Sequence, residues 1–76
     1  MPRITPVNYK KLIKVFEFLG FYCDRQEGDH LIYVKRGMKR PVVIPMYSDV
    51  PVFIIKNNLK SSGISREDYL RILRQV

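Results

Sequence analysis

The fold is decided by residues 21–45, which read FYCDRQEGDHLIYVKRGMKRPVVIP. Three runs typical of β-strands lie in this stretch, at residues 21–26, 30–35 and 41–45, and each of the two turns between them contains a glycine. Because short turns join neighbouring strands, we expect an antiparallel meander. The prolines at both ends of the third run indicate a short or edge strand.

A helix is predicted on the N-terminal side of this stretch. Residues 3–19 read as an entry segment and a helix, in which Thr5 is suited to be the N-cap and Pro6 the first helical residue. Gly20 suits the position that ends the helix. The apolar residues that share one face at helical spacing are Tyr9, Leu12, Ile13, Phe16 and Leu19.

Two further helices are predicted after the third strand. The first has Ser48 or Asp49 as its N-cap and Pro51 in its first turn, and it ends at residues 61–63. The second starts at Ser65 in a capping box, with an aspartate in its third position. The order helix, three strands, helix, short C-terminal helix predicts an α+β fold with helices on one face of the sheet. This order is similar to the double-stranded-RNA-binding fold.

Length, charge and cysteine content limit the class of protein. The chain has 76 residues and a formal net charge of +7, from 14 Lys and Arg against 7 Asp and Glu. This length predicts one domain, residues 1–76, that binds its partner on an open surface. The charge indicates nucleic acid, an acidic protein or an anionic membrane as partner, although a protein that is simply basic has the same balance. A single cysteine and the lack of a long apolar run or signal peptide favour the cytosol and no membrane association.

His30 is the only histidine, and imidazole is the side chain that exchanges protons near neutral pH. A surface or packing role is the plain alternative for a lone histidine. Cys23 alternates with Phe21 and is interpreted as a small core residue; a thiol activated by His30 across the hairpin is the minor alternative. No carboxylate cluster at ligand spacing and no glycine-rich nucleotide motif is present, so we expect neither a metal site nor a cofactor.

Basic residues are dense in the second turn. Four of the six residues from 35 to 40 are basic, namely Lys35, Arg36, Lys39 and Arg40. Further cations lie on the first helix, at Lys10, Lys11 and Lys14, and before the first turn, at Arg25. These side chains are candidates for phosphate binding, while an ordinary solvated surface is compatible with the same pattern.

Metal-free RNA cleavage needs few protein groups. The 2′-OH beside the scissile phosphate is the nucleophile, so the protein must remove its proton, protonate the leaving 5′-oxygen and stabilise charge on the phosphate. His30 fits the acid or base role, and Arg25 or Lys35 fits the charge role. Gly28 and Asp29 lie in the turn that positions His30. DNA lacks the 2′-OH and would not react by this route.

The chain resembles the HicA family of toxin mRNA interferases. No single segment is specific, but their order and spacing together are. The segments are Leu19-Gly20-Phe21, Arg25-x-x-Gly28-x-His30, Ile32-Tyr33-Val34, Arg40 to Pro45, Ile55 to Leu59, Gly63 to Glu67, and Tyr69-Leu70.

The resemblance implies a double-stranded-RNA-binding-like fold, ribosome-independent mRNA cleavage and growth arrest as part of a toxin–antitoxin stress response. It implies a HicB-like antitoxin as partner, and it places the family's catalytic histidine on His30 and its turn glycine on Gly28. A non-catalytic RNA-binding module of the same fold and a protein-interaction domain are the alternatives.

This chain departs from the family pattern at three places. Asp29 stands where the family commonly has serine, Tyr47 where it often has a second histidine, and Val52-Phe53 where it often has Gly-Thr. Asp29 has two opposite expected effects, because a carboxylate favours an adjacent imidazolium but repels a phosphate.

Overall fold

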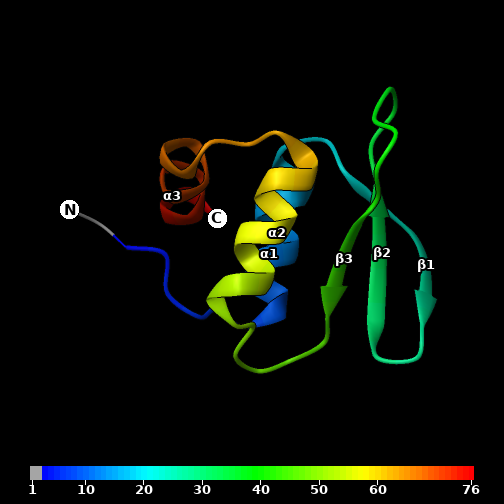
Figure 1. Cartoon of the computed structure of the whole chain (residues 1–76), viewed down its shortest axis with the longest axis horizontal. Helices are drawn as coiled ribbons and strands as arrows, with labels where there is room; N and C mark the ends of the chain where they lie inside the picture. The colour runs from blue at the N-terminus through cyan, green and yellow to red at the C-terminus, as the bar shows by residue number, and fades with distance from the viewer. Residues whose placement is uncertain (1–2) are drawn as a thin grey trace.

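The structure is a computed structural model that describes residues 3–76 (Figure 1). Helix α1 precedes three strands, and two helices follow them. The elements are α1 (Tyr9–Phe18), β1 (Tyr22–Glu27), β2 (His30–Val34), β3 (Val42–Pro45), α2 (Val52–Ser62) and α3 (Arg66–Gln75). The predicted α+β layout is therefore confirmed, with strand boundaries displaced by about one residue.

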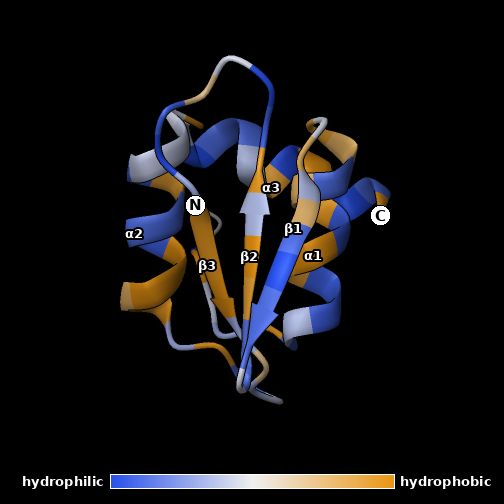
Figure 2. Ribbon diagram, turned by 90° about the vertical axis from the view of Figure 1, so that its right-hand side faces the viewer, coloured by the Kyte–Doolittle hydropathy of each residue, from blue (hydrophilic) through white to orange (hydrophobic). Residues whose placement is uncertain are grey.

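The three strands form an antiparallel sheet in the order β1-β2-β3, and all three helices lie behind it in Figure 2. This confirms the predicted meander and the helical cover on one face. Phe21 was predicted in the first strand, but its N–H donates to the Phe16 carbonyl at 3.0 Å. It therefore belongs to the end of α1, where Gly20 supplies the positive φ of 95° that reverses the chain.

The structure decides which side of β2 faces the helices. Tyr33 belongs to the hydrophobic core, and Leu31 packs against it. Val42 and Ile44, which pair with these two residues, also lie in the core. His30 therefore points to the other side of the sheet, because successive side chains of a strand alternate between its faces.

The prediction that Thr5 caps α1 is wrong. Asn8 is the N-cap, and its Oδ1 accepts a hydrogen bond of 2.9 Å from the backbone N–H of Lys10. Val7 forms an isolated bridge with Val50, whose N–H donates to the Val7 carbonyl at 2.7 Å. This pairing holds the backbone before Asn8 in an extended form, so Thr5 and Pro6 precede the helix.

The same bridge explains the start of α2. The predicted caps, Ser48 and Asp49, lie too early, because Val50 is extended and the N-cap is Pro51, which has no side-chain capping bond. The predicted cap of α3 is confirmed. Ser65 Oγ accepts a hydrogen bond of 3.1 Å from the Asp68 N–H.

The prediction that Cys23 is a core residue is also wrong, because Cys23 is exposed. It lies in β1, an edge strand whose six residues are all exposed, and the register shifts between Cys23 and Arg25. Such a bulge bends the strand and interrupts its alternation. Cys23 pairs with Tyr33, three residues along β2 from His30 and thus about 10 Å away, so no thiol–imidazole pair forms.

Tyr69 is fully buried, but its hydroxyl has no hydrogen-bond partner among residues 3–76. Burial also raises the pKa of Tyr69 to about 12. An unpaired buried hydroxyl is destabilising, so the Tyr69 side chain contributes packing at the expense of one unsatisfied polar group.

Tyr69→Phe should raise the free energy of unfolding by about 1 kcal/mol at pH 7, because it removes this hydroxyl and keeps the ring. The unfolded tyrosine ionises near its ordinary pKa of 10, and the folded one near 12, so wild-type stability falls as pH rises from 10 to 12. Between pH 10 and 12, we expect the free energy of unfolding of Tyr69→Phe to fall by about 2–3 kcal/mol less than that of wild type. Urea unfolding at pH 7 and at several alkaline pH values measures both effects; equal pH profiles would contradict the second.

Candidate active site

His30 begins β2, where it pairs with Glu27 of β1 and Pro45 of β3. The Glu27–His30 connection is a tight turn in which Gly28 takes a positive φ of 61°, a conformation that suits glycine. The His30 side chain is 43% exposed, so solvent and a substrate reach it. His30 therefore lies at an accessible position at the start of its strand.

Asp29 orients the imidazole. Its Oδ1 lies 2.8 Å from His30 Nδ1, and its backbone carbonyl accepts a hydrogen bond of 2.7 Å from the Met46 N–H. The turn is thereby tied to the segment after β3. Because Nδ1 is engaged by the carboxylate, Nε2 is the ring nitrogen that remains for a further hydrogen bond.

Tyr47 also lies at this site. Its ring centroid lies 6.5 Å from that of His30, at an interplanar angle of 70°. The Tyr47 carbonyl accepts a hydrogen bond of 3.1 Å from the Tyr9 N–H, which brings the start of α1 to the same end of the molecule. Tyr47 therefore lies beside His30 in an edge-to-face arrangement.

Arg25 lies on the same side of the sheet as His30, since it pairs with Ile32, two residues along β2. Its guanidinium contacts two carboxylates, Asp24 at 2.7 Å and Glu27 at 3.4 Å. The hydrogen bond to Asp24 is the main cause that raises the pKa of Arg25. These contacts use Nη1 and Nε, and a guanidinium has five N–H donors, so Arg25 keeps donors for a phosphate while the two carboxylates offset its positive charge.

The basic loop, which we define as Lys35, Arg36, Lys39 and Arg40, lies at the opposite end of the sheet from His30 (Figure 1). β2 separates the two ends by about 13 Å. Lys35 Nζ lies 5.8 Å from the centre of the Phe21 ring, and the other three side chains are exposed. The structure therefore separates the basic loop from the imidazole.

The lysines of α1 have different surroundings. Lys11 Nζ donates to the Val76 backbone carbonyl and so links α1 to the end of α3. Lys10 and Lys14 are exposed, and Lys10 lies in the first turn, at the end of α1 that approaches Tyr47. Of the three, Lys10 is placed nearest the His30 end of the molecule along the helix.

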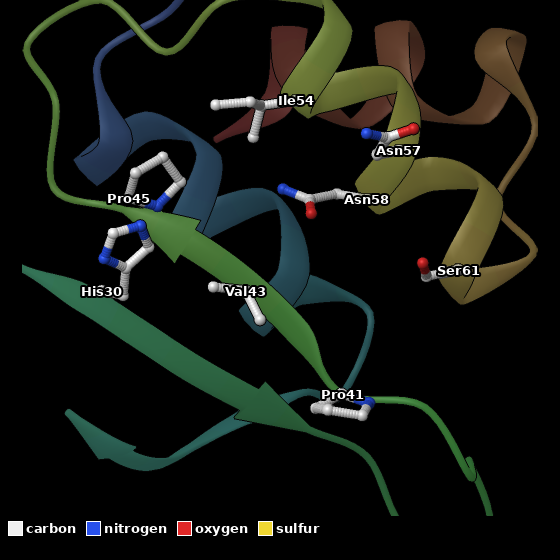
Figure 3. A pocket seen from close by; sticks show the side chains of 8 residues that line it. All are labelled: His30, Pro41, Val43, Pro45, Ile54, Asn57, Asn58 and Ser61. Carbon is white, nitrogen blue, oxygen red and sulfur yellow. The ribbon is translucent and has the colours of Figure 1, made fainter. Parts of the chain in front are cut away.

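A groove of about 320 Å³ runs between β3 and α2, with His30 at one end (Figure 3). Sequence reasoning missed it, because its two walls lie far apart along the chain. The available signal was Asn58, a polar residue that is buried beside Leu59 and one helical turn after the core residue Ile55. The lining residues are His30, Pro41, Val43, Pro45, Ile54, Asn57, Asn58 and Ser61.

The geometry and composition of residues 3–76 bear on metal ligation and on membrane-spanning helices. No group of three or more His, Cys, Asp or Glu side chains in this range is placed to hold a metal ion. No helix in the same range has the length and apolar character needed to cross a membrane.

A family model described as the HicA toxin of bacterial toxin–antitoxin systems matches residues 9–64. The chain belongs to the HicA toxin family. The match covers most of the chain, from the start of α1 to the residue before the α3 cap, and it includes His30, the basic loop and both walls of the groove. The resemblance inferred from the sequence is confirmed, and no curated protein matches the chain.

Membership of the HicA family assigns the chain to the toxin side of a toxin–antitoxin system, which includes an antitoxin partner. Helix α3 lies outside the matched segment. It nevertheless contributes Tyr69 and Ile72 to the core, so this HicA toxin uses α3 to complete its hydrophobic interior.

Proposed function

We propose that this HicA toxin cleaves mRNA as a metal-independent endoribonuclease, with His30 as general acid or base. The observation that carries the proposal is the His30–Asp29 pair. A half-exposed imidazole is held by a carboxylate at 2.8 Å, on a protein with a net charge of +7. Positive charge attracts RNA, and an oriented imidazole transfers protons at neutral pH.

The proposed reaction is an intramolecular transesterification. The 2′-oxygen attacks the adjacent phosphorus, its proton leaves to a base, and the bond from phosphorus to the 5′-oxygen breaks. The products are a 2′,3′-cyclic phosphate and a 5′-OH, which receives a proton from an acid. His30 Nε2 serves in one of these two proton transfers, while Asp29 holds the ring in place through Nδ1.

The proposed partners follow from the charge and the family. RNA phosphates would contact the basic loop and Lys10, with Arg25 and Lys14 as further candidates. A HicB-like antitoxin would cover the surface around His30 and stop cleavage in the cytosol, and its release would arrest growth. Tyr47 and Phe53 are exposed large apolar residues near this end of the molecule and suit such a contact.

Purified protein incubated with RNA in excess chelator tests the activity. We expect cleavage to continue, with 2′,3′-cyclic phosphate and 5′-OH ends, and an otherwise identical DNA to remain intact. Mass spectrometry of the fragments identifies the ends. Cleavage that stops with chelator, or that gives 5′-phosphate ends, would overturn the metal-free route.

Lys39→Ala/Arg40→Ala should weaken RNA binding and make it less dependent on salt. Each phosphate contact on a single strand contributes about 0.7 to the slope of log K against log salt, so the double variant should lower the slope by about 1.4. Fluorescence anisotropy with a labelled RNA measures it. The matched control is Arg71→Ala/Arg74→Ala, on exposed positions of α3. Equal slopes for both double variants would contradict a specific role for the basic loop.

A non-catalytic RNA-binding module is the second candidate. Tyr47 favours it, because it stands beside His30 where the family often has a second histidine, and a phenol is a poor proton donor at neutral pH. Salt-sensitive RNA binding with no cleavage product would support this candidate over the first.

A further inference from the structure

We propose that the groove between β3 and α2 binds one unpaired RNA base next to the phosphate at His30, and that Asn58 recognises the edge of this base. The inference rests on the proposed function for its substrate class. Three features support it: an unsatisfied buried amide, an apolar floor, and cationic or imidazole groups at the two ends of the groove.

Asn58 is the first feature. Only 6% of Asn58 is exposed, and its Nδ2 has no hydrogen-bond partner among residues 3–76. An unpaired buried amide is destabilising, and an apolar side chain at this position of α2 would avoid that cost. In Figure 3 the Asn58 amide extends from α2 toward β3. Rotation about χ2, which is broad for asparagine, brings either end of the amide to the groove.

The apolar floor is the second feature. Val43 is 39% exposed although it lies in β3, and the exposed Pro41 just before the strand lines the groove with it, whereas Pro45 at the end of β3 is buried. This surface suits the face of a base. Across from it, α2 presents further polar side chains at Asn57 and Ser61 (Figure 3). An apolar surface with a few polar groups at its edge is the usual composition of a site that binds a flat ring.

The two ends of the groove are the third feature. His30 and Pro45 stand at one end, and Pro41 stands at the other, directly after Arg40 of the basic loop. From Pro45 to Pro41 the strand covers about 13 Å. A short single-stranded segment along the groove therefore has its reacting phosphate at His30 and a following phosphate at the basic loop.

The edge of β3 does not suit an added peptide strand. β-Strand addition depends on main-chain hydrogen bonds along an exposed edge. Pro41 and Pro45 have no N–H, and the strand between them has only three residues. We therefore favour a base over a peptide as the occupant.

Adenine is the expected base. A side-chain amide presents one donor and one acceptor side by side, and this pair complements N7 and the N6 amino group of adenine. The interaction also supplies the acceptor that Asn58 Nδ2 lacks within residues 3–76.

Nuclear magnetic resonance titration of the ¹⁵N-labelled protein tests binding without any need for cleavage. The probes are the four nucleoside 3′-monophosphates and inorganic phosphate. We expect adenosine 3′-monophosphate to shift the Asn58 side-chain amide signals, while the Gln75 amide on α3 serves as the control. Equal shifts with all nucleotides and phosphate, or no shift of the Asn58 signals with any of them, would overturn the base site.

Asn58→Leu separates the inference from the proposed function. It removes the unsatisfied amide and keeps the number and branching of the side-chain heavy atoms, so the variant should fold at least as well as wild type. We expect preference for adenine beside the cut to fall by about five- to a hundredfold, while Gln75→Leu keeps the wild-type pattern. Unchanged cut sites in Asn58→Leu would refute the inference and leave the ribonuclease proposal intact. A wild-type protein that cleaves no RNA would refute the ribonuclease proposal. The titration would still show whether the groove binds a base, because it does not depend on cleavage.

Discussion

Replacing His30 with alanine should lower the rate of RNA cleavage by about a hundred- to ten-thousandfold, which is the usual contribution of one acid–base group. The fold should survive, because the His30 side chain is nearly half exposed and belongs to neither the core nor its packed rim. Free energy of unfolding should change by less than about 0.5 kcal/mol. In cells, the variant should no longer arrest growth.

The rate is measured with a fluorescent RNA under single-turnover conditions, and circular dichroism checks the fold. Glu27→Ala is the matched control, because Glu27 pairs with His30 across the same turn and is exposed. The control should keep its rate within a few fold. If His30→Ala cleaves as fast as Glu27→Ala, His30 has no acid–base role, and the arrangement with Asp29 serves another purpose.

Phe16→Ala should cause the largest loss of stability, about 3–5 kcal/mol. Phe16 is fully buried and packs edge-to-face on Phe21, with ring centroids 5.3 Å apart. A domain of this size has a total stability of about 4–11 kcal/mol. The substitution therefore removes a large fraction of it and leaves a cavity between α1 and the sheet.

Urea unfolding followed by circular dichroism measures this loss as a lower midpoint with a similar slope. Phe18→Ala is the matched control on the same helix, because Phe18 is 55% exposed. It should shift the free energy of unfolding by less than about 0.5 kcal/mol. Similar midpoints for the two variants would mean that Phe16 does not anchor the core.

Local chemistry determined the parts of the fold that the sequence predicted well. Ser65 caps its helix through the backbone N–H of a residue three positions away, and Gly20 reverses the chain immediately after α1. The turn at Gly28 likewise depends only on its neighbours, so the start of β2 at His30 was predictable. In each case the conformation is decided by interactions among a few neighbouring residues.

Contacts between distant segments explain the errors. Asn8 replaces Thr5 as the cap because Val7 pairs with Val50, more than forty positions later. Cys23 is exposed because β1 is an edge strand with a bulge, and alternation alone does not reveal where a sheet ends.

The candidate site divides in the same way. Gly28, Asp29 and His30 are consecutive, and their geometry follows from one turn, which made them recognisable from the sequence. Tyr47 reaches His30 only through the path of the chain after β3, and Asn58 faces β3 only because α2 packs along it.

The sequence by itself therefore determined the elements, their order, the family and the histidine at the start of β2. Backbone preference, capping and hydrophobic period act over a few residues and can be recognised along the chain. The tertiary structure alone decided which face of β2 carries His30, how far the basic loop lies from it, and that β3 and α2 enclose a groove. Burial and pairing depend on which distant segments meet, and that is decided by the packing of the whole domain.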